Sequence, residues 1–314
     1  MRHNPLTMKY LLVITMSAFL SITAKASDFP DDLGFKSLFR IDSDSGIKGP
    51  PYQKIVDELK ELESTFPEIV NVIEYGRSVG GRPLTIVKIQ KKLTIEGKLP
   101  AIYIGGSIHG DEYLNIEDRL PKWFAEQSEQ QGPVGNFLEK GGVIYIAPIL
   151  NPDGYEKRSR TNDLGIDLNR DFTVIEAQVE GLKQPETSAL AFFLEEDLKK
   201  EGRKLEITMD YHCCIGALLY PWSFKGPTLP SEQLIKHLNI VEAMKSTVGG
   251  EIKSGTTPTI LGYSAKGTSK DFYYEHFGAT SFTFEGRRNR EDKYFDEHTK
   301  MWDLILQRFE FTSI

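Results

Sequence analysis

The chain has 314 residues, enough for one large domain or two small ones, and its 39% hydrophobic and 26% charged residues are ordinary for a folded protein. A chain of this size and composition can bury a sizeable core, so intrinsic disorder is excluded as the default. The net charge of −7 comes without a basic stripe, which argues against DNA and RNA as partners.

The first 26 residues have the pattern of a signal peptide. Arg2 and Lys9 make the start positive, an apolar stretch covers 11–22, and Ala24-Lys25-Ala26 offers a small-x-small cleavage site. The alternative is an uncleaved membrane anchor, but the apolar stretch is short and interrupted by Ser and Thr. We therefore expect residues 1–26 to be removed, and the mature protein to be secreted or periplasmic without stable membrane insertion.

The residues after this segment divide into a short leader and a folded domain. Residues 27–49 are rich in Asp, Ser and Gly, which predicts a leader on the surface, and residues 50–314 form one domain. A helix is expected after Pro50-Pro51, because apolar residues then recur at near-helical spacing among Lys and Glu.

Strand-like and helical patterns alternate through the rest of the chain. The strand-like runs cover 69–75, 84–89, 101–104, 143–146, 205–209 and 279–284. The helical patterns lie near 113–128, 185–200, 231–247, 268–277 and 294–308. Several runs are almost continuously apolar, as expected of strands covered on both faces. The predicted fold class is therefore α/β, with a mixed, mostly parallel central sheet flanked by helices on both faces.

Two candidate metal ligands follow the apolar run 101–104. His109 and Glu112 are three residues apart in a glycine-containing stretch, so one tight turn can aim both side chains at one point. An imidazole nitrogen and a carboxylate are suitable zinc ligands. The pattern is weak by itself, because a solvated His and Glu at the start of a helix would look the same.

A third candidate ligand, His212, comes shortly after the run 205–209. Two His and one Glu with an open fourth position are typical of a catalytic zinc site, so we expect one Zn²⁺ per chain. The remaining histidines lie in the first segment or in charged helical patterns, where exposed or core side chains are expected: His3, His237, His276 and His298.

Further motifs occur in a definite order around these three residues. They are Asn151-Pro152-Asp153-Gly154, Asp167-Leu168-Asn169-Arg170, Tyr220-Pro221-Trp222, Tyr263-Ser264-Ala265-Lys266-Gly267 and Phe282-Thr283-Phe284-Glu285. Together with the metal motifs, this order resembles the M14 family of zinc metallocarboxypeptidases, the carboxypeptidase A-like group. The resemblance runs from about residue 51 to about residue 309, and it implies that 50–314 is a zinc carboxypeptidase catalytic domain.

The resemblance implies two catalytic residues beside the metal. Glu285 would be the general base, and later the general acid, for the zinc-bound water, work that suits a carboxylate next to a metal. The alternative is a strand-end glutamate paired with Arg287 or Arg288. Arg160 would polarise the scissile carbonyl and stabilise the oxyanion, although Arg158 lies only two residues away.

The same resemblance assigns recognition of a free C-terminal carboxylate to Asn169 and Arg170. An arginine fork matches a carboxylate with two parallel hydrogen bonds. Asp167 resembles the acid that orients the first histidine, here His109. Tyr263 resembles the mobile tyrosine that closes over the substrate terminus, on a loop that flanking glycines would help to move. An ordinary loop tyrosine is the alternative.

Lys270 is the candidate specificity residue. In the family, the residue seven positions after the mobile tyrosine lies at the floor of the pocket for the terminal side chain, and here that residue is Lys270. A buried ammonium would favour a terminal Glu or Asp, or a peptide with an extra carboxylate such as a wall peptide containing diaminopimelate. The alternative is a lysine that extends to solvent from the start of a helix.

The only two cysteines, Cys213 and Cys214, are adjacent and follow His212 directly. We expect two buried thiols, because neighbouring cysteines can close only a strained ring, and a disulfide between them is the alternative. Both depart from the family, which commonly has a small residue at the first of these positions.

The function predicted is that of a zinc-dependent metallocarboxypeptidase, which hydrolyses the C-terminal peptide bond with metal-activated water. We expect a monomer whose partner is a peptide with a free C-terminal carboxylate. A close alternative keeps this chemistry and cleaves the γ-D-glutamyl-diaminopimelate bond of bacterial cell-wall peptides. A third, a non-catalytic peptide-binding module on the same fold, would require the loss of a ligand or of the base, and the sequence retains them.

Overall fold

The computed structural model describes residues 44–92, 99–248, 252–287 and 294–309, and the fold is given for these residues. The predicted signal peptide, 1–26, and residues 27–43 of the predicted leader lie outside them. Within these described ranges, no helix is long and apolar enough to cross a membrane.

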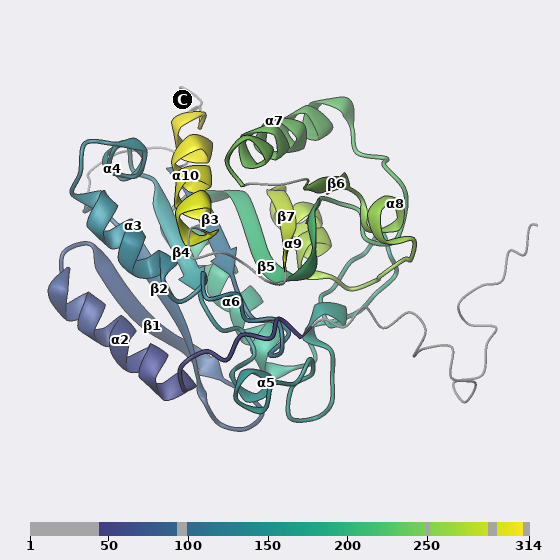
Figure 1. Cartoon of the computed structure of the whole chain (residues 1–314), viewed down its shortest axis with the longest axis horizontal. Helices are drawn as coiled ribbons and strands as arrows, with labels where there is room; N and C mark the ends of the chain where they lie inside the picture. Colours follow the sequence, from purple (N-terminus) through teal and green to yellow (C-terminus); the bar gives the residue numbers. More distant parts are fainter. Residues whose placement is uncertain (1–43, 93–98, 249–251, 288–293, 310–314) are drawn as a thin grey trace, which may run out of the picture. The chain divides into compact units, whose positions relative to one another are not determined.

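One sheet of seven strands organises the described part of the chain (Figure 1). The strands are β1 (Val70–Arg77), β2 (Pro83–Gln90), β3 (Leu99–Gly105), β4 (Val143–Ala147), β5 (Arg203–Leu219), β6 (Lys253–Gly255) and β7 (Thr280–Arg287). Their order is β1-β2-β4-β3-β5-β6, and β7 also pairs with β5. The two pairings made by β2 are antiparallel, and the pairings of β3 and β5 are parallel. The predicted mixed, mostly parallel sheet is confirmed.

Helices cover both faces of this sheet. They are α2 (Tyr52–Thr65), α3 (Leu120–Ser128), α4 (Pro133–Glu139), α5 (Pro152–Lys157), α6 (Pro185–Lys200), α7 (Ser231–Thr247), α8 (Thr257–Leu261), α9 (Ser269–Phe277) and α10 (Tyr294–Gln307). One buried apolar cluster joins α2, α3, α4, α7 and α10 to the sheet, and a second joins α6 and α9 to it. The predicted α/β architecture with helices on both faces is therefore confirmed.

The strands alternate between these two clusters. In β3, Ile102 and Ile104 belong to the first cluster, while Ala101 and Tyr103 belong to the second. Successive side chains of a strand point to opposite faces, and here both faces are buried. This double burial explains why the strand sequences are continuously apolar.

One predicted helix is shorter than expected. The pattern over 113–128 predicted a helix throughout, but α3 begins only at Leu120. The amides of Leu114 and Ile116 donate to the buried carboxylate of Glu117 at 3.1 Å, and Asn115 has a left-handed φ of 56°. These side-chain hydrogen bonds compete with helical ones, so the backbone before Leu120 forms a turn.

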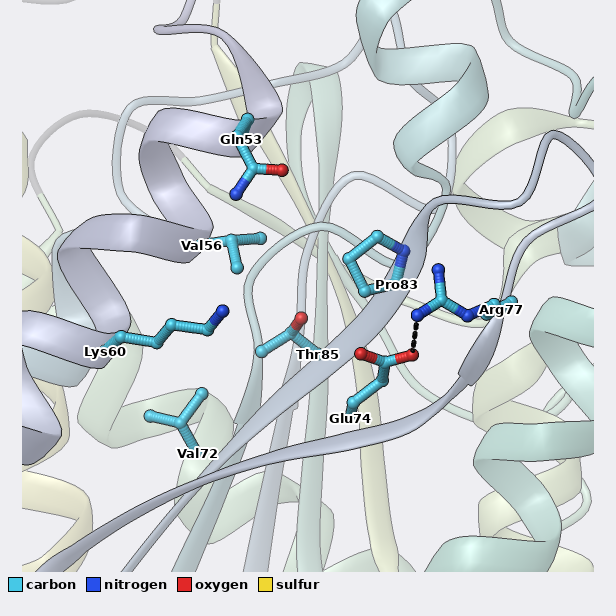
Figure 2. A pocket seen from close by; sticks show the side chains of 8 residues that line it. All are labelled: Gln53, Val56, Lys60, Val72, Glu74, Arg77, Pro83 and Thr85. Carbon is cyan, nitrogen blue, oxygen red and sulfur yellow. Dashed lines mark ion pairs between the residues drawn. The ribbon is translucent and has the colours of Figure 1, made fainter.

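A cavity of about 330 Å³ lies between α2 and the hairpin β1–β2 (Figure 2). Its lining residues are Gln53, Val56, Lys60, Val72, Glu74, Arg77, Pro83 and Thr85. Glu74 and Arg77 form an ion pair with each other at 2.7 Å, as Figure 2 shows. None of the predicted site residues lines this cavity, so it is separate from the candidate active site.

Candidate active site

The candidate metal ligands meet because β3 and β5 are parallel neighbours in the sheet. His109 and Glu112 lie in the loop that leaves the end of β3, and His212 lies on β5. The register places Gly105, the last residue of β3, opposite Asp210 of β5. His212 is inside β5 rather than beyond its end, since the strand continues to Leu219.

The three side chains form a compact buried group. One ligand atom from each of His109, Glu112 and His212 lies within 4.8 Å of the others. The two Glu112 oxygens each lie 2.9 Å from a Nδ1 atom, Oε1 from that of His109 and Oε2 from that of His212. Burial favours a neutral Glu112, but the charge of His109 and a hydrogen bond with it outweigh this effect and hold its pKa below the usual range. The group therefore offers a carboxylate between two imidazoles.

Gly110 allows this loop to fold so tightly. Its N–H donates to the carbonyl of Ser159 at 2.9 Å, which ties the loop to the residues after α5. A Cβ at this position would lie 1.9 Å from the carbonyl carbon of Gly154. Any larger residue would push the His109 loop away from α5, so glycine is required here.

Asp167 supports the first histidine. Its Oδ1 lies 3.0 Å from Nε2 of His109, the ring nitrogen that faces away from Glu112. The same oxygen accepts from the amide of Asn169 at 2.9 Å, which caps the short 3₁₀ turn η1 (Leu168–Arg170). Burial opposes ionisation, but His109 and then Arg160 hold the pKa of Asp167 well below its usual range. Asp167 therefore orients the ring while remaining ionised.

The structure shows which of two neighbouring arginines, Arg158 or Arg160, lies next to the candidate metal ligands. Arg160 donates through Nη1 to Glu112 Oε1 at 2.9 Å and through Nε to Asp167 Oδ2 at 3.1 Å, so its guanidinium adjoins the candidate ligands. Arg158 instead donates to the carbonyl of Ile47 at 2.7 Å and pairs with Asp44. Arg158 therefore fastens the segment before α2, and Arg160 is the arginine of the site.

The predicted carboxylate-binding residues lie next to this group. Asn169 is buried, with its Nδ2 3.5 Å from Nε2 of His212 and its Oδ1 accepting from the amide of Ser269 at 2.9 Å. Arg170 is half-buried and donates to the carbonyl of Asn169 at 2.7 Å. Tyr263 is 46% exposed, and partial burial raises the pKa of its phenol against the opposing charge of Arg170. The charged groups that act on this phenol include Arg170, Glu285 and Arg160, which are predicted site residues.

Glu285 lies beside His212 because β5 and β7 are parallel neighbours that pair these two residues in register. Burial, reinforced by the negative charge of Glu112, raises the pKa of Glu285 to about 8. His109, Arg160 and then Lys270 act in the opposite direction. All of these charged groups are predicted site residues, so Glu285 faces the site.

Lys270 does not extend to solvent, since its side chain is only 2% exposed at the start of α9. Its ammonium donates to the hydroxyl of Ser223 and, at 3.1 Å, to that of Thr257. The carboxylate of Asp271 lies 3.8 Å from Nζ. Burial lowers the pKa of Lys270, and Asp271 opposes this shift.

Sequence reasoning missed the three residues around this ammonium. Ser223 directly follows the motif Tyr220-Pro221-Trp222, and Asp271 directly follows Lys270, so adjacency to recognised residues was the available signal for both. Thr257 lies 13 residues before Lys270 and carries no comparable signal. Its position depends on how α8 packs.

The expectation of two buried thiols is wrong. Cys213 and Cys214 form a disulfide, and their Cα atoms lie 3.1 Å apart. Cys213 is buried and Cys214 is half-buried. The amide of Cys213 donates to Glu112 Oε2 at 3.2 Å, so the bonded pair adjoins the candidate ligands through its backbone. The sequence shows that the two cysteines are neighbours but does not reveal whether their sulfurs are bonded.

Comparison with known proteins gives the same family throughout. Residues 55–304 match the sequence model of the peptidase M14 family, described as zinc carboxypeptidase. Carboxypeptidase A6 of Mus musculus is 27% identical over 263 residues, covering 73% of this chain and 58% of that protein. Carboxypeptidase SOL1 of Arabidopsis thaliana is 26% identical over 261 residues, covering 78% of this chain and 51% of that protein. The chain thus spans between half and three fifths of the length of these relatives.

Solved structures share the fold. Carboxypeptidase A from Helicoverpa armigera superposes with a TM-score of 0.64 at 20% identity, over 82% of this chain and 71% of that one. A metallo-carboxypeptidase from Burkholderia cenocepacia superposes with a TM-score of 0.63 at 18% identity, over 82% of this chain and 68% of that one. At such identities the likeness concerns the arrangement of strands and helices.

Proposed function

The chain belongs to the zinc carboxypeptidase family, and from that premise we propose that it is a hydrolase that removes the C-terminal residue of peptides. The observation that carries this proposal is the buried group of His109, Glu112 and His212, with Glu285 beside it on the neighbouring strand. Metal ligands and a general base in one site are what metal-assisted hydrolysis requires.

The residues present fit a zinc ion. Two imidazole nitrogens and one carboxylate are a catalytic zinc set, which leaves a fourth position open. Nδ1 of His109 is buried and lies 2.9 Å from Oε1 of Glu112, so ligand atoms of both side chains converge on one point. A zinc ion held there would polarise the scissile carbonyl and lower the pKa of its bound water.

The proposal gives Asp167 the task of orienting His109, and this can be tested through metal affinity. We expect Asp167→Asn to weaken zinc binding by about 10- to 100-fold, because the acceptor that fixes the ring of His109 loses its charge. Competition with a chelator of known affinity measures the change. Asp163→Asn, on the same loop but paired with Lys157 at 2.6 Å, is the matched control and should bind zinc like the wild type.

The roles proposed for the remaining site residues come from the family resemblance and agree with what their groups can do. Glu285 accepts a proton from the attacking water and returns it to the leaving amine. The guanidinium of Arg160, which uses two of its five N–H donors on Glu112 and Asp167, steadies the oxyanion with the others. Asn169 and Arg170 bind the free carboxylate, and Tyr263 closes over it.

We further propose a preference for an acidic terminal side chain. The support is Lys270, whose side chain is 2% exposed. The charges of Arg170 and Glu285 both affect the pKa of its ammonium. A buried ammonium in the substrate pocket favours a carboxylate there. The same observation favours the second candidate, a cell-wall peptide whose diaminopimelate residue carries an extra carboxylate.

Digestion of defined peptides tests the activity and separates these substrates. Peptides ending in Glu, Gln, Leu or Lys, and muropeptides containing the γ-D-glutamyl-diaminopimelate bond, are incubated with the zinc-loaded protein. Products that lack one C-terminal residue, most rapidly from the Glu peptide, support the first proposal. Internal cuts, or no cuts with zinc bound, contradict it, and cleavage of muropeptides alone favours the second candidate.

The proposed location follows from the N-terminal pattern alone. We propose that residues 1–26 direct the chain to a secreted or periplasmic location, that 27–49 form a leader before the catalytic domain 50–314, and that the protein acts as a monomer. Mass measurement of the mature protein tests the cleavage, and light scattering tests the monomer.

A further inference from the structure

The buried ammonium of Lys270 is surrounded by polar side chains rather than by apolar ones alone. Three polar side chains lie around its ammonium, Ser223, Thr257 and Asp271, and Thr268 contacts Ser223; all four are at most 4% exposed. An ammonium has three hydrogens to donate, and two of them go to the hydroxyls of Ser223 and Thr257. Among the described residues, no third acceptor lies within hydrogen-bond distance of Nζ, so one hydrogen remains for a ligand.

Ser223 forms hydrogen bonds with three other members of this cluster. Since an ammonium can only donate, Ser223 Oγ accepts from Lys270 and must use its own hydrogen elsewhere. Oγ1 of Thr268 lies 2.7 Å from it. The backbone N–H of Ser223 meanwhile donates to both oxygens of Asp271, at 3.0 and 2.9 Å. Ser223 therefore links the buried ammonium and the buried carboxylate through two different groups.

The cluster also adjoins the residues that receive the substrate terminus. The amide of Ser269, one residue before Lys270, donates to Oδ1 of Asn169 at 2.9 Å. The charged groups that act on Lys270 are Asp271, Arg170, Glu285 and Asp210. The carboxylate of Asp271 lies 3.8 Å from Nζ of Lys270, and its side chain is fully buried. Burial raises the pKa of Asp271, and the charge of Lys270 together with the hydrogen bonds of Ser223 opposes this shift, so the two buried groups support each other's ionisation.

We propose that Asp271 and Ser223 are positioning residues that keep Lys270 charged and direct its free hydrogen into the specificity pocket, so that the pocket selects a terminal side chain carrying a carboxylate. This inference rests on the proposed carboxypeptidase function. The opposing possibility is that Asp271 neutralises Lys270 and makes the pocket indifferent to charge. The two predict opposite effects of removing the Asp271 charge.

The decisive experiment compares two peptides that differ only in a terminal Glu or Gln. For the zinc-loaded full chain, the ratio of their kcat/KM values is measured from about pH 6 to about pH 9.5, since kcat/KM reports the free enzyme. Titration of Glu285 affects both peptides and cancels in the ratio. The preference for Glu should be present at low pH and disappear as pH rises through the pKa of Lys270.

We expect Asp271→Asn to lower the ratio at neutral pH by about tenfold and to move the loss of preference at least about one pH unit lower, because a missing countercharge favours neutral lysine. Ser223→Ala, which keeps the backbone bond to Asp271, should lower the ratio by about threefold and serves if Asp271→Asn folds poorly. Lys270→Met should abolish the preference, so that the Glu-to-Gln ratio falls to about one and no longer changes with pH.

A matched control is available in another buried lysine. Lys88 is 4% exposed and pairs with Asp197 at 2.7 Å, on β2 and α6. Asp197→Asn removes the same kind of countercharge away from the site and should leave the Glu-to-Gln ratio at its wild-type value. The melting temperature of each variant shows whether the fold is retained.

A direct measurement of the Lys270 pKa tests the positioning role of Asp271 separately from the proposed substrate preference. In protein with ¹³C-labelled lysine, the Lys270 resonance is identified by its absence in Lys270→Met, and its pKa is followed by NMR. A lower pKa in Asp271→Asn, together with a wild type that does not prefer Glu, supports the positioning role and refutes the proposed preference. An unchanged Lys270 pKa, or a Glu-to-Gln ratio that rises in Asp271→Asn, overturns the inference.

Discussion

Replacement of Glu285 by glutamine is expected to lower kcat by about 100- to 10,000-fold, while zinc content and peptide affinity stay close to those of the wild type. Glutamine keeps the size of the side chain but cannot accept the proton of the attacking water. Because Glu285 pairs in register with His212, the substitution changes the chemistry next to the metal without removing a ligand. Steady-state kinetics on a peptide ending in Glu, with zinc measured in parallel, gives both quantities.

Glu206→Gln provides the control, since Glu206 lies on β5, the strand that neighbours β7 and its Glu285, but pairs with Lys204 at 2.7 Å. It should retain wild-type kcat. A Glu285→Gln protein that keeps more than about a tenth of the wild-type kcat would refute the role of Glu285 as general base. A wild type that binds zinc and peptide without turnover would instead support the non-catalytic module.

Loss of His212 is expected to remove both activity and the stabilisation that zinc provides. A ligand present at about 1,000 times its dissociation constant stabilises the folded protein by about 4 kcal/mol, so zinc should raise the melting temperature of the chelator-treated wild type. In His212→Ala the site keeps only His109 and Glu112, and the zinc-dependent rise should disappear. Thermal denaturation with and without added zinc measures this effect independently of activity.

His276→Ala is the matched control for this experiment. The side chain of His276 is 45% exposed on α9 and is not part of the candidate metal group. This variant should retain one zinc ion per chain and the full rise in melting temperature. One zinc per chain in His212→Ala, with unchanged thermal behaviour, would refute the proposed ligand set.

Most of the long elements could be predicted from periodicity. The helices over 185–200 and 231–247 have the predicted bounds, because each is a long pattern with a clear start. Helices α4, α5 and α8 have only seven, six and five residues, too few for a periodic pattern to emerge. The missing first turns of the helix predicted from 113 reflect the buried carboxylate of Glu117, an interaction that hydrophobic spacing does not encode.

The candidate site was predictable as a set of residues, though less so as an arrangement. The order of motifs identified which histidines, carboxylates and arginines belong together. It left open whether Arg158 or Arg160 reaches the ligands, and the fold decided this by tying Arg158 to Ile47. The local turn around these residues directs two arginines of equal charge to different partners.

By itself, the sequence determined the family, the α/β class and the chemical types in the site, because strand periodicity and motif order are properties of the chain alone. Only the tertiary structure decided which distant groups meet. Asp167 reaches His109 across 58 residues, and Ser223 reaches Lys270 across 47. Such contacts depend on side-chain direction at the ends of neighbouring strands and helices. The burial that results gives the Lys270 ammonium its fixed partners, whereas a solvated lysine would have none.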